Sequence, residues 1–587
     1  MLLLVAVTMK MSKKFKSEEE LPDCVISYIF SKLCLKDLVK TSVLSKRWLH
    51  EWRSRIDLNF DLHNMFDYNT LQELPQNLPV PLLKTFQSEF ATRMDRFMLK
   101  HRGDMIRSLR VDFPLGNQHS DVIDKMIFKG IAKGVERIEL LFSYQNNSDF
   151  EIEPYKFVFE LLSLDDSLTY LHLQKCHLVA PINLSGFNNL RTLVLHLVVV
   201  KQDLLQGMLS SCIHLVDFTL NDCEFNSDLK IISPKLFNLN IVNCGVEIGR
   251  EKNIDIFASN LSSIEYSCNG REVHSMNIKA DMLSKFSYRG REISQHIGFS
   301  GLKNVTTIVF DGLHECISDD IVPHLFSECL QLEDVTFKNC WMICRMKIIS
   351  PKLRRLSIID CCYDGMSPYR MSIDALNLSS FEYSGYTRVF SVNAPRLSKV
   401  FWNATTREET PFAIHPYESL LYIENLTMIM STSQVEKLTE VLVEFQNLKN
   451  LELFIEGAYD HNLDYFWILD IAMASHHLEK LSVTIENSHM IGLQRKRREY
   501  AGFFHNDLKY VELHGCVCTI NVIELASHLL RNAYSLKKIT FSSLDKFYMG
   551  AGRWTKGSNV CCWGFKRNFI HEMLKDDVNE HCQLTIV

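Results

Sequence analysis

One spaced pattern of apolar residues and a cysteine recurs along most of this 587-residue chain. A full copy has apolar residues at its first, fourth, sixth and eleventh positions and cysteine at its ninth, as in Leu168-x-x-Leu171-x-Leu173-x-x-Cys176-x-Leu178. Other full or nearly full copies start at Leu215, Leu236, Leu332, Leu353 and Leu508, and shorter ones at Leu190, Leu261, Leu283, Leu302, Leu378, Leu397, Leu448 and Leu478. Because a unit of about 20 to 29 residues cannot bury its own apolar face, such repeats must stack into an array.

A second, longer period lies over the short one. Residues Ile231–Leu236 (IISPKL) recur unchanged at Ile348–Leu353, and Leu261–Tyr266 (LSSIEY) recurs with one replacement at Leu378–Tyr383. The offset is 117 residues in both cases (348 − 231 and 378 − 261). Two independent segments with the same offset predict a duplicated block of about five repeats.

The short period fits the template of leucine-rich repeats, in which every repeat adds one strand to a parallel sheet. We therefore predict an α/β fold, a leucine-rich-repeat solenoid with a curved parallel sheet. Side chains alternate along a strand, so the leucines should face the core and the residues between them should face solvent on the concave side. The exposed positions that we expect to contact a target protein are Tyr170, His172, Asp217, Asn240, Asp334, Lys338, Arg355 and Tyr510. Their mixed chemistry fits an ordinary solvated surface equally well, and the sequence leaves both interpretations open.

Six cysteines occupy the ninth position of the pattern: Cys176, Cys223, Cys244, Cys340, Cys361 and Cys516. Strands of neighbouring repeats lie about 4.8 Å apart, so pairs of these thiols could form a disulfide or part of a metal site. We favour a buried ladder of reduced thiols, because the chain has no tight Cys-x2-Cys pair and reads as an intracellular protein. The tail residues Cys561, Cys562, His571, His581 and Cys582 are too loosely spaced for a known zinc finger.

Motifs of catalysis are absent from the sequence. It has no Gly-x-Ser-x-Gly, His-Glu-x-x-His or phosphate-binding Gly-rich string. His101-Arg102-Gly103-Asp104 resembles a kinase catalytic loop only superficially, since no Asp-Phe-Gly follows it. We predict no catalytic residue, no metal site and no cofactor.

The N-terminal segment carries a different pattern. Pro22 suits the first turn of a helix, and apolar residues follow at three- and four-residue steps as far as Leu33. Ser45 is placed to cap a further helix, on which Trp48 and Trp52 share one face. A unit this small buries too little surface to be stable alone, so we expect it to dock on another part of the assembly.

The order Leu-Pro, spaced isoleucines and Leu-Ser-Lys-Arg-Trp resembles the F-box, the three-helix module that binds a Skp-type adaptor of a cullin ubiquitin ligase. The resemblance implies that adaptor binding rests on Leu21, Pro22, Ile26, Ile29, Leu33, Leu44 and Trp48. Cys34 stands where many plant F-boxes have proline, a departure that alters a turn rather than the helical faces. The alternative interpretation is a helical hairpin that caps the following domain.

Further segments are similar to plant F-box proteins with leucine-rich repeats. They include residues 90–97, 101–103 and 106–113, and near the C-terminus the stretches 508–515, 523–526, 529–533 and 536–539, which look like the FBD domain of that family. The resemblance implies a substrate-recognition subunit of a Skp–cullin–F-box ubiquitin ligase, with a Skp-type adaptor, a cullin and an unknown target as partners. The alternative is a non-degradative interaction scaffold. A small-molecule sensor is a third idea, for which no residue indicates a ligand.

Composition and charge argue against two classes of binding partner, nucleic acid and membrane. The net charge is −6 and charged residues make up 23% of the chain, so the electrostatic driver of non-specific nucleic-acid binding is missing. No apolar run reaches the eighteen residues that a membrane span needs. We expect a cytoplasmic or nuclear protein that binds neither nucleic acid nor membrane. The basic run Gln494–Arg498 reads either as a solvated loop, which we favour, or as a nuclear-import signal.

These patterns predict six regions. Residues 1–20 form a disordered tail, 21–60 the F-box, and 61–145 a connecting segment with irregular first repeats. Residues 146–500 form the solenoid, 501–545 an FBD-like unit of strand, amphipathic helix and strand that closes it, and 546–587 a C-terminal tail.

Overall fold

The structure is a computed structural model. It describes residues 25, 28–29, 33–41, 43, 48, 53–66, 80–142, 153–162, 167–179, 187–225, 227–245, 252–268, 274–290, 299–313, 321–340, 345–361, 370–384, 389–403, 422–431, 447–456, 465–485, 496–515, 517–548, 554–559 and 563–587. The chain divides into two compact units, Met1–Ser227 with Ile231–Leu236 and Asp228–Lys230 with Phe237–Val587. We call them unit one and unit two.

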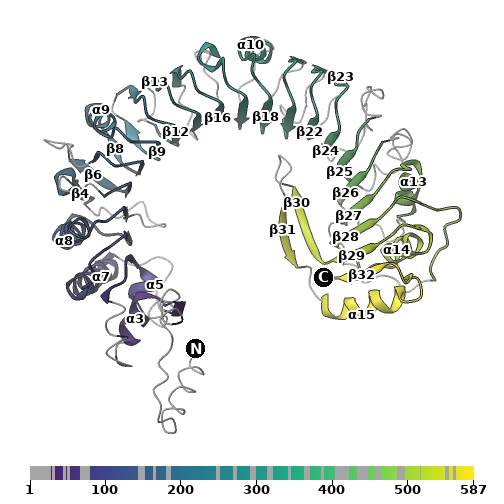
Figure 1. The fold of residues 1–587 in the computed structure, drawn as a ribbon, viewed down its shortest axis with the longest axis horizontal. Helices are drawn as coiled ribbons and strands as arrows, with labels where there is room; N and C mark the ends of the chain where they lie inside the picture. Colours follow the sequence, from purple (N-terminus) through teal and green to yellow (C-terminus); the bar gives the residue numbers. More distant parts are fainter. Residues whose placement is uncertain are drawn as a thin grey trace, which may run out of the picture. The chain divides into compact units, whose positions relative to one another are not determined.

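Unit one is a ladder of parallel strands with helices behind it (Figure 1). Its six ladder strands pair in register, each with the next, and are β1 (Asp57–Asp61), β2 (Ser108–Asp112), β3 (Arg137–Leu141), β5 (Tyr170–Gln174), β7 (Thr192–His196) and β9 (Asp217–Asn221). The helices are α3 (Leu35–Thr41), α5 (Leu62–Met65), α7 (Val80–Lys100), α8 (Ser120–Ile131) and α9 (Gln202–Ser211). Two small parallel pairs complete the unit, β4 (Tyr155–Val158) with β6 (Cys176–Val179) and β8 (Val199–Val200) with β10 (Glu224–Phe225).

Unit two continues the same plan over a longer ladder (Figure 1). Its parallel strands are β12 (Asn238–Val242), β14 (Ser263–Ser267), β16 (Lys285–Arg289), β17 (Thr307–Asp311), β18 (Asp334–Lys338), β20 (Arg355–Ile359), β22 (Ser380–Ser384), β24 (Lys399–Asn403), β25 (Asn425–Ser431), β26 (Asn450–Glu456), β27 (Lys480–Ile485), β28 (Tyr510–Gly515), β29 (Lys538–Ser542) and β32 (Gln583–Ile586). These ladders confirm the predicted leucine-rich-repeat solenoid.

A second layer and one hairpin accompany the ladder of unit two. The second layer contains the parallel strands β13 (Lys252–Phe257) and β15 (His274–Lys279), the parallel strands β19 (Arg345–Ile349), β21 (Arg370–Asp374) and β23 (Val389–Asn393), and the helices α10 (Ile321–Glu328), α13 (Phe466–Ala474), α14 (Ile520–Asn532) and α15 (Trp563–Leu574). The strands β30 (Leu544–Tyr548) and β31 (Trp554–Asn559) form an antiparallel hairpin of their own.

The predicted alternation holds in many ladder strands, such as β7, β9, β12, β17 and β18, whereas β20, β22 and β27 bury open-face residues as well. Leu171 and Leu173 are fully buried, whereas Tyr170 and His172 between them face the other side of β5 and are only partly buried. The predicted duplication has a counterpart in the first strands of each copy: β12 and β14 begin at 238 and 263, and β20 and β22 begin 117 residues later, at 355 and 380.

The cysteine of each repeat sits just after a backbone corner. Lys175, Asp222, Asn243, Asn339 and Asp360 all have φ between 48° and 53°, and each directly precedes a cysteine of the pattern. This left-handed conformation turns the chain off the strand, and Asn and Asp tolerate it best among residues with a side chain. The corner drops the next side chain into the core.

Burial of the thiols is confirmed for the five pattern cysteines that the structure describes, while Cys516 lies outside the described residues. Their Sγ atoms donate to the backbone carbonyl two residues earlier, at distances from 3.1 Å for Cys340 to 3.4 Å for Cys176. Burial raises the pKa of Cys176 and of Cys361, so these thiols stay protonated at neutral pH. No disulfide is found among the described cysteines.

Two predicted boundaries change. The ladder begins inside the predicted F-box range, since β1 at Asp57–Asp61 already pairs with β2. The predicted tail 546–587 is not a tail: it holds β31, α15 and the last ladder strand β32, which pairs with β29. Both boundaries were predicted wrongly because the strands at them pair with segments far away in sequence, or belong to a repeat that lacks the cysteine of the pattern.

Candidate protein-binding surfaces

The first candidate surface is the predicted F-box. Of its seven predicted adaptor contacts, the structure describes Ile29, Leu33 and Trp48, all partly buried. The other four, Leu21, Pro22, Ile26 and Leu44, lie outside the described residues. Adaptor binding by these side chains therefore stays a prediction.

The described part of this segment is anchored on the start of the solenoid. Helix α3 buries Leu35 and Leu38. The Leu35 amide donates to Asn64 Oδ1 at 3.1 Å, and Arg55 Nη1 donates to the Leu33 carbonyl at 3.1 Å. Asn64 belongs to α5, whose N-terminus is capped by Asp61, the last residue of β1. The described part of this segment is thus held on unit one, at the turn that follows the first ladder strand.

The second candidate surface is the open face of the sheet, which we define as the side chains at the first, third, fifth and seventh positions of the ladder strands. All eight predicted target contacts lie on it. In unit one, the Arg137 guanidinium lies 3.4 Å from the centre of the Tyr170 ring, and the rings of His172 and His196 stack with centres 6.3 Å apart. Burial lowers the pKa of His172 to about 4, so this imidazole is neutral at physiological pH.

In unit two, four of the predicted contacts lie on β12, β18 and β20. Asp334 and Arg355 are register partners, and Arg355 Nη2 lies 2.7 Å from the Asp334 carboxylate. A similar pair joins Arg289 to Asp311 at 2.8 Å. Both arginines are exposed, whereas the two carboxylates are largely covered. Such surface pairs contribute little to stability, so the arginine side chains remain available to a partner. Asn240 lies on β12, four ladder strands before β18, so the predicted contacts are spread along the face and form no single compact cluster.

The later part of the open face is covered, which no pattern in the sequence predicts. Tyr510 at the start of β28 is 43% exposed, but His514, four residues further along the same strand, is buried. The covering element is the hairpin β30–β31, which contacts β27 and β28 and stands on the side of the sheet opposite to α13 and α14 (Figure 1). A hairpin signal exists in the sequence, because Gly550 and Gly552 separate the two segments. It cannot reveal the surface against which the hairpin packs.

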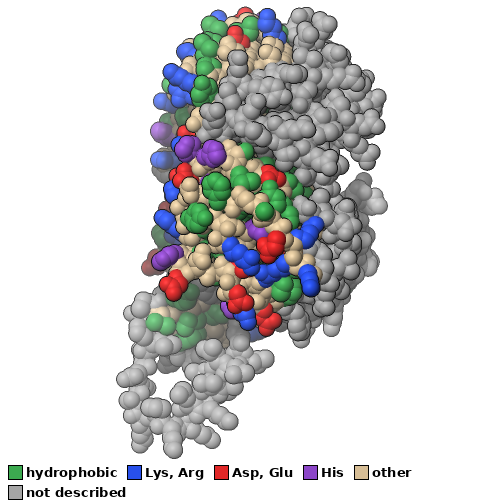
Figure 2. All heavy atoms as spheres, turned by 90° about the vertical axis from the view of Figure 1, so that its right-hand side faces the viewer, with side chains coloured by type: hydrophobic (Ala, Val, Ile, Leu, Met, Phe, Trp, Pro, Cys, Tyr) green, Lys and Arg blue, Asp and Glu red, His purple; other side chains and the backbone are tan. Residues whose placement is uncertain are grey.

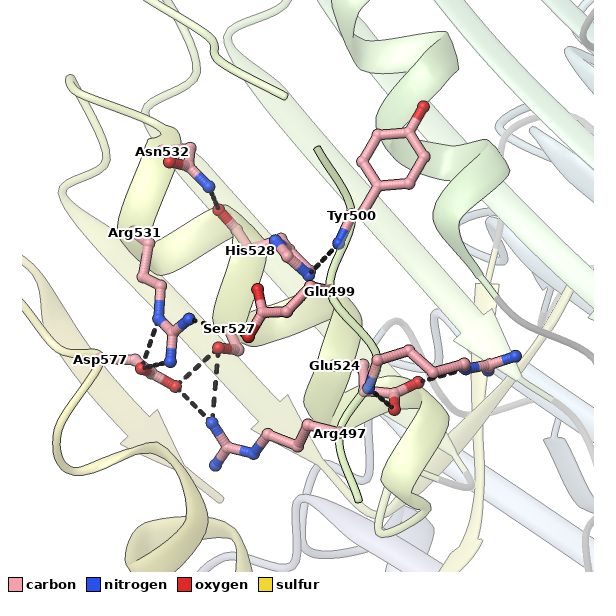
Figure 3. Close-up of polar contacts among 10 residues, drawn as sticks. Arg497, Glu499, Tyr500, Glu524, Ser527, His528, Arg531, Asn532 and Asp577 are labelled. Carbon is pink, nitrogen blue, oxygen red and sulfur yellow. Dashed lines mark hydrogen bonds and ion pairs between the residues drawn. The ribbon is translucent and has the colours of Figure 1, made fainter. Parts of the chain in front are cut away.

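The described residues 496–498 of the basic run Gln494–Arg498 differ from the solvated loop that we favoured. Arg497 Nη1 lies 2.8 Å from the Asp577 carboxylate, and Arg498 Nε lies 3.2 Å from Glu524, which is buried in α14. Asp577 also accepts from Ser527 Oγ at 2.7 Å and from Arg531 Nε at 2.7 Å (Figure 3). The described end of the run is therefore no solvated loop, because its arginines tie α14 to the C-terminal segment.

The charged side chains described on this side of the chain are of mixed sign. Figure 2 faces the side where α14 and α15 lie in Figure 1, and it shows Lys and Arg side chains interspersed with Asp and Glu. Within the described ranges, no three His, Cys, Asp or Glu side chains gather as a metal site would require. None of the described helices combines the length and the apolar character that crossing a bilayer demands.

Two known protein families match this chain. The F-box domain family matches residues 19–58. The leucine-rich-repeat family described as "At1g61320/AtMIF1, LRR domain" matches residues 97–294 and 295–578, which is more than half of the chain. The chain belongs to this leucine-rich-repeat family. It carries the predicted F-box in front of the repeats.

Its relatives include several Arabidopsis thaliana proteins. The F-box protein At1g80960 is 28% identical over 240 residues, covering 40% of this chain and 47% of that protein. The F-box/FBD/LRR-repeat protein At1g13570 is 26% identical over 221 residues, covering 38% and 47%. The FBD-associated F-box protein At1g66310 is 27% identical over 221 residues, covering 36% and 42%. The chain thus spans about half the length of the curated relatives it matches, and their names support the F-box, repeat and FBD assignments.

Within this family plan, α14 lies in the FBD-like unit. The structure has the predicted order of strand, helix and strand, as β28, α14 and β29. The helix has the predicted amphipathic sequence, but its polar residues Asn521, Glu524, Ser527 and His528 are buried instead of facing solvent. Hydrogen bonds to Arg498, Asp577 and the Tyr500 amide make this polar burial tolerable.

Proposed function

We propose that the chain is the substrate-recognition subunit of a Skp–cullin–F-box ubiquitin ligase. The F-box match at residues 19–58, followed by a leucine-rich-repeat solenoid, is the observation that carries the proposal. The F-box binds a Skp-type adaptor and, through it, a cullin. The open face of the solenoid binds the target protein, in the cytoplasm or the nucleus.

The contacts between the F-box and the first ladder strand support this division of labour. The hydrogen bonds of Leu33 to Arg55 and of Leu35 to Asn64 fix the described part of the F-box on unit one. A target held on the open face of unit one then keeps a set distance from the adaptor. Such positioning is the catalytic contribution of a receptor, because it makes transfer to the target lysine an effectively local event. The chemistry itself belongs to the partner enzymes, and the chain needs no catalytic residue, metal or cofactor of its own.

The test is affinity purification of the full chain from plant cells under proteasome inhibition. We expect the wild-type chain to recover adaptor, cullin and a stabilised target together. A Leu21→Ala, Pro22→Ala, Trp48→Ala variant should lose adaptor and cullin and keep the target, and Asp576→Asn, an exposed change far away in sequence, should recover all three.

Two outcomes would contradict the proposal. If the triple variant recovers as much adaptor as the wild type, the F-box does not act as one. If adaptor binding depends on the F-box but no protein's half-life changes when the chain is removed, the scaffold alternative takes its place.

A further inference from the structure

The covered part of the open face has an apolar seat. Phe401, Ile429 and Phe454 lie on β24, β25 and β26 at open-face positions, yet all three are buried and form one cluster. Trp554, the first residue of β31, packs against them. Its ring stacks on Phe454 with centres 5.2 Å apart and planes 22° apart. One flat aromatic side chain thus fills a seat made by three neighbouring strands.

The strands next to the seat carry buried polar groups that make no hydrogen bond to the described residues. Thr484 on β27 is the register partner of both Phe454 and His514. Ser482, Thr484 and His514 are 3%, 0% and 9% exposed. Within the described part of the chain, their Ser Oγ, Thr Oγ1 and His Nε2 atoms have no hydrogen-bond partner, although the Glu512 carboxylate lies 3.6 Å from the imidazole. A buried polar atom without a partner destabilises the closed arrangement, so the hairpin covers this region imperfectly.

The hairpin is also separable from the sheet. Strands β30 and β31 pair with each other as a two-stranded sheet, and among the described strands neither pairs with the ladder. Lifting the hairpin would therefore expose the open face without breaking a strand pairing of the solenoid. Elements held by few backbone bonds to their surroundings open most readily.

We propose that the β30–β31 hairpin is an internal strap on the target-binding face, displaced when a target is bound. This inference rests on the proposed function. The partner is an extended protein segment that places an aromatic side chain on Phe401, Ile429 and Phe454 in place of Trp554. Its neighbouring residues carry hydrogen-bonding groups that reach Ser482, Thr484 and His514, as a strand lying along the face would.

The test uses the full chain bound to its adaptor and a displayed library of ten-residue peptides with tryptophan fixed at the centre. Selection is made on Trp554→Ala, in which the strap is weakened. Enriched peptides should bind Trp554→Ala at least tenfold more tightly than the wild type, because the intramolecular competitor is weakened. Thr555→Ala, an exposed change on the same strand, should behave as the wild type. Adding Phe454→Ala or Thr484→Val to Trp554→Ala should each weaken peptide binding at least tenfold.

Equal binding to the wild type and to Trp554→Ala, or no enrichment at all, would overturn the strap. Hydrogen exchange on the wild type gives an independent measurement, in case the variants fold poorly. Amides of residues 544–559 should exchange at least 100-fold faster than those of β28, and equal protection would overturn the inference. Adaptor recovery is measured on the same samples. Failure of peptide binding with the adaptor retained removes only the strap, whereas loss of the adaptor from the wild type removes the proposed function.

Discussion

The hydrogen bonds to Asp577 allow a direct test of how helix α14 is held in place. The carboxylate accepts hydrogen bonds from Ser527, Arg531 and Arg497 at 2.7, 2.7 and 2.8 Å. Asp577→Asn removes the charge while nearly preserving shape. We expect the variant to loosen α14, because the helix then buries polar residues with one anchor fewer.

The magnitude follows from the exposure of the partners. Each hydrogen bond to a charged group contributes about 1.5–3 kcal/mol. The sum over the three bonds is larger than the free energy that we expect Asp577→Asn to cost. The side chains of Arg497 and Arg531 are 25% and 43% exposed, so water replaces part of what they lose. We expect a loss of about 2–4 kcal/mol in the local opening free energy of α14.

Hydrogen exchange of the α14 amides measures this quantity directly. Since each 1.4 kcal/mol is tenfold, exchange of Val522 to Leu530 should quicken by about 30- to 700-fold. Asp576→Asn is the control: it neutralises an exposed carboxylate next door, and should change the opening free energy by less than about 0.5 kcal/mol. A change below threefold in the Asp577 variant would refute the reasoning.

The pH dependence of the same cluster has a definite sign. Burial by itself raises the pKa of Asp577, but the hydrogen bonds from Ser527, Arg531 and Arg497 together hold it below its usual value. A depressed carboxyl pKa stabilises the folded state above the unfolded pKa of about 3.9 and ceases to do so as the pH falls through the folded value. The difference between wild type and Asp577→Asn should therefore shrink below about pH 4, as monitored by limited proteolysis.

Four further outcomes are expected. Leu197 has φ of 52° and is 44% exposed, so Leu197→Asn should relieve left-handed strain and raise the unfolding free energy of its unit by about 1 kcal/mol in urea titrations; no increase would contradict this. Native protein should resist alkylation at Cys223, Cys244, Cys340 and Cys361 and contain no zinc, and rapid labelling of all four or stoichiometric metal by elemental analysis would show otherwise. The pKa of His172 is about 4 in the folded state and 6.5 in the unfolded state, so the unfolded state binds more protons between these two pH values. Unit one should therefore lose stability as the pH falls through this window. In thermal melts, His172→Gln should remove part of this pH-dependent loss. Arg355→Glu should leave folding within about 1 kcal/mol and weaken target recovery, and the added change Asp334→Lys should restore the ion pair but not the target.

Much of the fold could be predicted because its rules are local. The alternation of Leu171 and Leu173 with polar neighbours defines a strand with one buried face, and the repeated hexapeptide at Ile231 and Ile348 marks equivalent strands. The burial of the repeat cysteines follows from the same spacing.

The sequence could not predict contacts between segments distant along the chain. Arg497 and Asp577 are 80 residues apart, and a basic run looks the same whether its partners are water or buried carboxylates. The same limit applies to Trp554, whose seat comes from three strands up to 153 residues earlier (554 − 401). The open face could be predicted, but not which part of it the chain itself covers.

The duplicated block has a consequence for how such chains change length. The hexapeptide Ile231–Leu236 and its copy Ile348–Leu353 mark equivalent points, each just before a strand, β12 and β20, and the next ladder strand begins 25 residues later in both copies. Crossing over between the two copies removes or adds 117 residues and regenerates an identical junction. Deletion puts β20 in the place of β12 with its corner and thiol intact. Recombination at this repeat therefore yields solenoids that differ by whole blocks, so the open face is lengthened or shortened without any new junction sequence having to be selected.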